Sequence, residues 1–96
     1  MAKSYRFTGK VFKYPGMAAW HFVTLPKKES ADIKAHAPKR AGWGAVKISV
    51  TVGKTTWDTS IFPTKEGVYL LPLKASVRKH EDIYDGDTID VQCILI

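Results

Sequence analysis

Cysteine is nearly absent from this sequence of 96 residues, and long apolar runs are missing. The single cysteine, Cys93, has no internal partner for a disulfide and lies in an apolar segment, so we expect a buried, inert thiol. The longest apolar runs, such as residues 68–73, are far shorter than the roughly 20 residues that span a bilayer. The N-terminus also lacks the apolar stretch of a signal peptide. These absences predict a cytoplasmic protein outside the membrane.

Patterns typical of catalytic and metal sites are missing as well. The chain has three histidines, at His21, His36 and His80. Their spacing is not that of a zinc site, and no cysteine or glutamate completes one. The scattered glycines form no phosphate-binding loop. A group of acids near the C-terminus is expected to form a turn, at Asp85, Asp87 and Asp90. We therefore expect no enzyme, no metal site and no cofactor.

Positive charge is concentrated in the first part of the chain. The formal net charge is +6. Residues 1–57 contain eleven lysines and arginines against two acids, whereas residues 58–96 contain four against seven. A basic face is a reason to consider a nucleic acid or another polyanion as a partner. The other interpretation is a surface that serves solubility alone, and the charge pattern leaves both open.

Alternation of apolar and polar residues is the strongest pattern present. It predicts a strand over residues 46–52, with Val46, Ile48, Val50 and Val52 on one buried face. A glycine at position 53 suits a two-residue hairpin turn, so residues 55–62 should return antiparallel. Residues 68–73 add a third strand, and residues 88–96 supply the last one with apolar side chains at alternate positions.

The N-terminal part predicts one more hairpin, with a turn at Pro15 and Gly16. Before the turn, apolar residues alternate at Tyr5, Phe7 and Val11; after it, Trp20, Phe22 and Thr24 alternate with His21 and Val23. We expect Trp20 and Trp57 to lie in the core, because a small barrel needs large side chains to fill it.

Two segments have the features of short helices. Residues 26–37 are charged and rich in alanine, and are bounded by prolines. Residues 74–81 follow a proline and, with Leu73, place Val77 on an apolar face. Six strands and two short helices leave no room for βαβ crossovers. The sequence therefore predicts a mainly β fold, a small closed or split six-stranded β-barrel that forms a single domain over residues 1–96.

Several stretches are more specific than a generic strand pattern. They are residues 42–48 (GWGAVKI), 57–63 (WDTSIFP), 69–78 (YLLPLKASVR) and 85–91 (DGDTIDV), together with the opening Phe7-Thr8-Gly9 and residues 20–26 (WHFVTLP). Together they resemble the bacterial family called domain of unknown function 1905. The resemblance covers nearly the whole chain, and it implies a closed or split β-barrel without a settled biochemical activity.

The C-terminal half alone is similar to a second group of proteins. Its order of strand, proline, short basic helix and the segment 83–91 (IYDGDTIDV) resembles the core of AbrB/MazE-type double-split barrels. That resemblance implies a dimeric DNA-binding regulator or antitoxin. The chains of those regulators are much shorter and complete their barrel by dimerising, whereas here the N-terminal strands are available to complete it.

Lys74 and Arg78 are the first candidate binding residues. Helical spacing places them four apart on one face, where two like charges repel unless an anion or an acid such as Asp82 relieves them. A bound phosphate or carboxylate is one interpretation. The other is a pair of solvated cations whose stems cover Leu73.

Trp43 and Arg40 are the second pair of candidates. Trp43 lies between two glycines, and an exposed aromatic beside basic residues stacks well on a base or a sugar. We predict a non-enzymatic binding or accessory module, a monomer or weak homodimer. It would hold a small anionic ligand or a protein partner in a groove at Trp43, Lys74, Arg78 and Arg40. The alternative is a nucleic-acid-binding regulator that uses the basic N-terminal half, with an affinity that falls steeply with salt.

Overall fold

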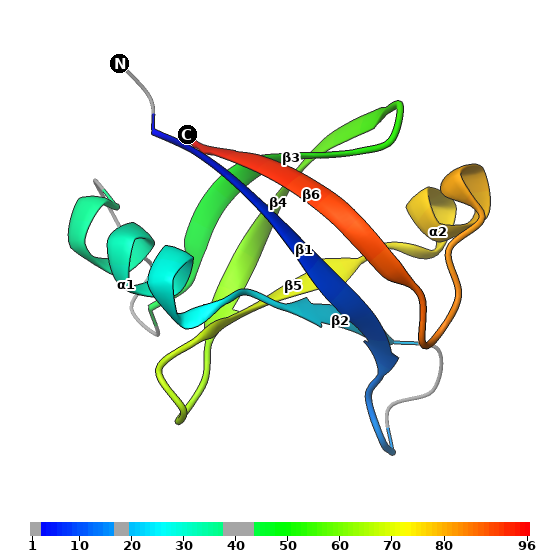
Figure 1. The fold of residues 1–96 in the computed structure, drawn as a ribbon, viewed down its shortest axis with the longest axis horizontal. Coiled ribbons are helices and arrows are strands. Elements are labelled where there is room, and N and C mark those ends of the chain that lie inside the picture. The colour runs from blue at the N-terminus through cyan, green and yellow to red at the C-terminus, as the bar shows by residue number, and fades with distance from the viewer. Residues whose placement is uncertain (1–2, 17–19, 38–43) are drawn as a thin grey trace.

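The computed structural model describes residues 3–16, 20–37 and 44–96. Six antiparallel strands form one closed barrel in the order β1-β2-β5-β4-β3-β6, and β6 pairs back onto β1 (Figure 1). The strands are β1 (Ser4–Lys13), β2 (His21–Thr24), β3 (Val46–Val52), β4 (Thr55–Pro63), β5 (Tyr69–Leu73) and β6 (Thr88–Leu95), and the helices are α1 (Lys27–His36) and α2 (Ala75–Glu81). The predicted mainly β, six-stranded barrel with two short helices is confirmed. No helix of the described residues is long and apolar enough to cross a membrane.

Alternate side chains of the strands point into one core. On β3 the predicted inner face is confirmed, because Val46, Ile48, Val50 and Val52 are all buried. On β6 the inner row includes Cys93, which is 1% exposed. Burial raises the pKa of the Cys93 thiol from 9.0 to about 11. The thiol is therefore protonated at neutral pH, as expected for a structural cysteine.

Strand β1 belongs to both sides of the barrel. Its residues 4–10 pair with β6, and its residues 11–13 pair with β2. Gly9 lies just before this change of partner, and a Cβ on Gly9 would collide with a methyl group of Val23. A residue without a side chain is therefore needed where β1 passes close to β2.

The prediction that Trp20 fills the core is wrong, whereas Trp57 is buried as expected. In the β1–β2 hairpin Val11 is the partner of Val23, and both are fully buried, so Val23 points inward. Trp20 belongs to the opposite row of the alternation and therefore lies outside the barrel, where 51% of it is exposed.

Aromatic rings cover the outside of this hairpin. Phe22 packs there against three other rings, with centroid distances of 6.1 Å to Phe12, 5.5 Å to Tyr14 and 5.9 Å to Trp20. These contacts leave Phe22 only 7% exposed although it lies on the outer face. We call these four residues the outer aromatic cluster.

The two helices lie on opposite sides of the barrel (Figure 1). Helix α1 buries Ile33 and Ser30, and the Ser30 hydroxyl accepts a hydrogen bond of 3.1 Å from the backbone N–H of Tyr69 on β5. The Tyr5 hydroxyl donates to the Asp32 carboxylate over 2.6 Å, which ties α1 to β1 as well. Helix α2 contributes Val77 to the core.

Strands β4 and β5 are joined at one end only. The structure describes both strands along their whole length. The residue pairs between them are Phe62 with Leu70 and Pro63 with Tyr69. Farther along β5, Pro72 has no backbone N–H to donate, which is typical of a strand position on an edge. The barrel is therefore closed by a short pairing and is split beside the second half of β5, where α2 begins.

Glu81 fastens α2 to the β3–β4 hairpin. Its carboxylate accepts hydrogen bonds from the Thr55 hydroxyl over 2.6 Å and from the backbone N–H of Lys54 over 3.2 Å. The Thr55 hydrogen bond is the main reason that the pKa of Glu81 lies below its ordinary value of 4.5. Gly53 lies in the turn of this hairpin with a φ of 58°. It also leaves room for the Glu81 carboxylate, because a Cβ on residue 53 would collide with it.

Removal of the Thr55 hydroxyl is expected to destabilise the protein in a pH-dependent way. A carboxylate whose pKa is lowered by folding stabilises the fold above its unfolded pKa, and this contribution disappears as the pH falls through the lowered value. Thr55→Val should therefore reduce the melting temperature at neutral pH and leave it nearly unchanged well below the ordinary carboxyl pKa. Thermal unfolding followed by circular dichroism measures both, with Thr56→Val as the neighbouring control. An equal loss at both pH values would contradict the assignment to Glu81.

Candidate functional site

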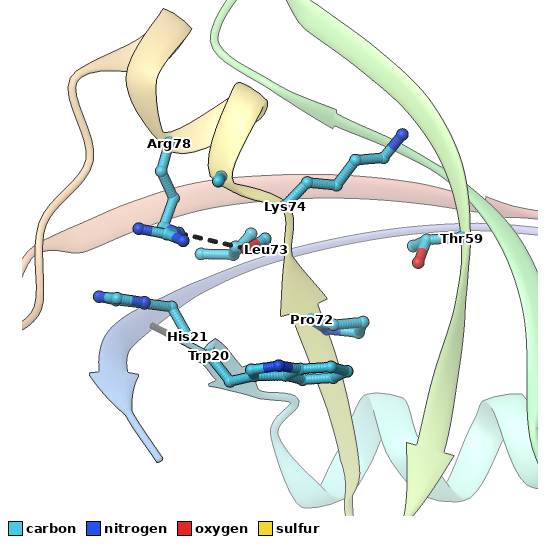
Figure 2. Close-up of a pocket in the computed structure, with 8 residues that line it drawn as sticks. Trp20, His21, Thr59, Pro72, Leu73, Lys74 and Arg78 are labelled. Carbon is cyan, nitrogen blue, oxygen red and sulfur yellow. Dashed lines mark hydrogen bonds between the residues drawn. The ribbon is translucent and has the colours of Figure 1, made fainter. Parts of the chain in front are cut away.

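A groove of about 350 Å³ lies at the split between β4 and β5 (Figure 2). Four parts of the chain line it. They are Trp20 and His21 at the start of β2, Thr59 on β4, Pro72 and Leu73 on β5, and Lys74, Ala75 and Arg78 at the beginning of α2. Pairing of His21 with Leu73 across β2 and β5 brings the first and third of these segments together, and the fourth follows Leu73 directly in the chain.

Both predicted cations, Lys74 and Arg78, line this groove. Their expected arrangement within one helix needs a correction, because Lys74 is the residue before α2 and has an extended backbone, with φ −61° and ψ 151°. Its carbonyl oxygen accepts the Arg78 N–H over 3.0 Å, so Lys74 still begins the first turn. The two side chains share one groove although only Arg78 is helical, and their binding of an anion stays a prediction.

The Arg78 guanidinium is held in place by the barrel. Its Nε donates a hydrogen bond of 3.2 Å to the carbonyl oxygen of Leu73, drawn as a dashed line in Figure 2. A guanidinium carries five N–H donors in a fixed plane, and its fork matches the oxygens of a carboxylate or phosphate. Anchoring through Nε therefore fixes a planar donor group beside the groove.

Lys74 supplies a second positive charge to the groove. Its side chain is exposed and forms no ion pair with any residue that the structure describes. None of the eight lining residues is an aspartate or a glutamate. The groove therefore combines two cationic side chains without an acidic one.

The opposite wall of the groove is apolar and aromatic. In Figure 2 the Trp20 indole lies edge-on to the viewer, with the Pro72 ring next to one of its faces. On the side of α2, Arg78 points towards His21 and Lys74 extends away from Trp20. The sequence prediction missed Trp20 as a site residue because it placed that side chain in the core. The signal that could have found it is Thr24, because a polar residue in the same row as Trp20 suggests that this row faces outward, and Thr24 is indeed exposed.

The other predicted site residues, Trp43 and Arg40, lie outside the described residues. Their predicted part in binding is therefore not tested. Gly44, where the description resumes, has a φ of 89° and lies close to Pro63 at the end of β4.

Of the three acids that were expected in one turn, Asp85 and Asp87 lie there, whereas Asp90 lies in β6, where it is the partner of Thr8 on β1. Asp85 accepts a hydrogen bond of 3.0 Å from the backbone N–H of Lys13, and Asp87 accepts one of 2.8 Å from that of Tyr84. Gly86 between them has a φ of 94°. In the part of the chain that the structure describes, no three His, Cys, Asp or Glu side chains are grouped so that they could hold a metal ion.

The fold and the site define a small antiparallel β-barrel, split on one side by a groove with an aromatic wall and a basic rim. A family model described as domain of unknown function 1905 (DUF1905) matches residues 7–93. The chain therefore belongs to the DUF1905 family, as the sequence resemblance indicated. Comparison with curated proteins gives no match. The comparisons do not show the weaker likeness to AbrB/MazE-type regulators.

Proposed function

We propose that this DUF1905 protein is a non-enzymatic binding module that holds a small anionic ligand in the groove, as a cytoplasmic monomer or weak homodimer. The observation that carries the proposal is that Lys74 and Arg78 line one groove, and that none of the described residues lining it is acidic. Two cationic groups that line the same concavity attract an anion. Arg78 adds a planar fork of donors in a fixed position.

The size of the groove favours a small molecule as the occupant. Its volume of about 350 Å³ is near the lower end of the range of roughly 300–1,000 Å³ for small-molecule sites. Among the described residues, its lining includes His21 but no carboxylate or thiol. General acid–base and nucleophilic catalysis commonly use such groups in pairs, so this lining supports binding without a catalytic step.

Titration with inorganic phosphate at low salt, followed by two-dimensional NMR, tests the proposal. The double substitution Lys74→Gln/Arg78→Gln is expected to weaken phosphate binding by roughly tenfold or more, because each lost charged hydrogen bond is worth about 1.5–3 kcal/mol. The control Lys65→Gln/Lys79→Gln removes the same charge from exposed positions outside the groove and should bind nearly as well as the unchanged protein. Equal losses in both variants, or no phosphate binding at all, would overturn the proposal.

The same variants address the alternative of a nucleic-acid-binding regulator. Random duplex and single-stranded DNA would be titrated at two salt concentrations by fluorescence anisotropy. Binding through the basic N-terminal half falls steeply with salt, because phosphate contacts release counterions. It should also survive the substitution of Lys74 and Arg78, since both lie in the acidic part of the chain. That combination of results would favour the regulator over the anion-binding module.

A further inference from the structure

The aromatic wall of the groove restricts what kind of anion fits. Trp20 is a large apolar residue, yet 51% of it is exposed. Its ring is held by Phe22 of the outer aromatic cluster, with 5.9 Å between the ring centroids and 33° between the ring planes. Trp20 is thus in contact with the protein through Phe22 and half-exposed as a residue, which are the two properties of an aromatic residue on which a ligand ring can stack.

The platform and the basic rim belong to the same groove. Trp20 and Pro72 present two rings on one side, and Lys74 and Arg78 lie on the side of α2 (Figure 2). A ligand that contacts both sides needs a flat apolar group at one end and a negative charge at the other. Inorganic phosphate alone would leave the indole uncovered, and an uncharged ring would make no use of the positive charge of Lys74 and Arg78.

We infer that the ligand is a small molecule that joins a planar aromatic ring to an anionic group, and that its chemical class is a mononucleotide. The ring stacks on Trp20 beside Pro72, and the phosphate lies at Lys74 and Arg78. The Thr59 hydroxyl, on the β4 wall of the same groove, supplies a group that both donates and accepts hydrogen bonds, which suits a ribose or the edge of a base. This inference rests on the proposed function, because it uses the same two cations for the anionic end.

A single nucleotide agrees better with the groove than a nucleic-acid strand. The groove is small, at about 350 Å³, and its described lining includes one tryptophan. Surfaces that bind single strands without sequence preference combine a basic track with several aromatic platforms, on which successive bases stack. Tyr14 is also exposed on the outer aromatic cluster but does not line the groove, so it serves as a matched control.

Isothermal titration calorimetry with adenosine 5′-monophosphate, adenosine and inorganic phosphate tests the inference. The nucleotide is expected to bind roughly tenfold or more tightly than either fragment, because stacking and charge act together. Trp20→Leu keeps an apolar side chain but removes the flat ring, and it should reduce nucleotide affinity to about that of phosphate. Tyr14→Leu should leave it unchanged. Circular dichroism confirms that both variants are folded.

The outcomes separate this inference from the proposed function. If phosphate binds through Lys74 and Arg78 but the nucleotide binds no more tightly, the aromatic inference is overturned and the anion site stands. Full nucleotide affinity in Trp20→Leu overturns it as well. If neither phosphate nor nucleotide binds, both fail. An eight-nucleotide single strand that binds much more tightly than the mononucleotide, with a steep salt dependence, would replace the mononucleotide by a nucleic acid.

Discussion

Leu71→Ala is expected to reduce the free energy of unfolding by about 2–5 kcal/mol, the usual range for truncation of a buried leucine. Leu71 is fully buried on β5 and is the partner of Val23 on β2. Because β5 joins β4 through two residue pairs only, packing of the Leu71 side chain is a main contribution to keeping this side of the barrel closed. Urea denaturation with a linear extrapolation measures the loss.

The neighbouring Leu70 is the matched control for this substitution. It has the same side chain on the same strand, but it belongs to the opposite row and is only half-buried. Leu70→Ala should therefore destabilise the protein clearly less than Leu71→Ala. Similar losses for both substitutions would show that the inner and outer faces of β5 are not distinguished as the structure has them.

Gly9→Ala is expected to destabilise the protein by about 1–3 kcal/mol, as overpacking in a core does. Gly9 does not have a positive φ, so the backbone conformation at this position is open to alanine. In a strand, alanine would otherwise be the more stable choice, since glycine loses more conformational freedom on folding. The expected loss therefore comes from the collision of the new Cβ with the Val23 methyl group.

A double-mutant cycle separates this collision from other causes. Val23→Ala removes the methyl groups that the new Cβ would meet, so the loss in Gly9→Ala/Val23→Ala should be smaller than the sum of the two single losses. Val11→Ala is the control, because Val11 is equally buried opposite Val23 but is not among the atoms nearest to that Cβ. Additive losses with Val23→Ala would contradict close approach of β1 and β2 at Gly9.

Much of the barrel could be predicted because burial on one face imposes a period of two on the sequence. The inner rows of β3 and β6 follow directly from alternating apolar residues. Trp20 escaped this reasoning because each row of β2 has one buried apolar residue, Val23 in the inner row and Phe22 in the outer one. The identity of the inner row there is decided by the partner strand, through the pairing of Val23 with Val11.

The site was only partly predictable for a related reason. Lys74 and Arg78 are close in sequence, so local spacing brought them together. Trp20 and Thr59 reach the same groove through long-range strand pairing, which no local pattern encodes. The split that forms the groove had one signal, since Pro72 within a strand indicates an edge position. Pro72 alone does not indicate which of the strands beside β5 is unpaired at this position.

The most direct measurement of whether the groove is the binding site is an NMR chemical-shift map with adenosine 5′-monophosphate on the unchanged protein. The predicted result is a set of saturable shifts confined to the Trp20 indole N–H and the amides of Thr59, Lys74, Ala75 and Arg78. Shifts that instead cluster on the lysines of α1, or that spread over the basic N-terminal half while these signals stay unchanged, would contradict it.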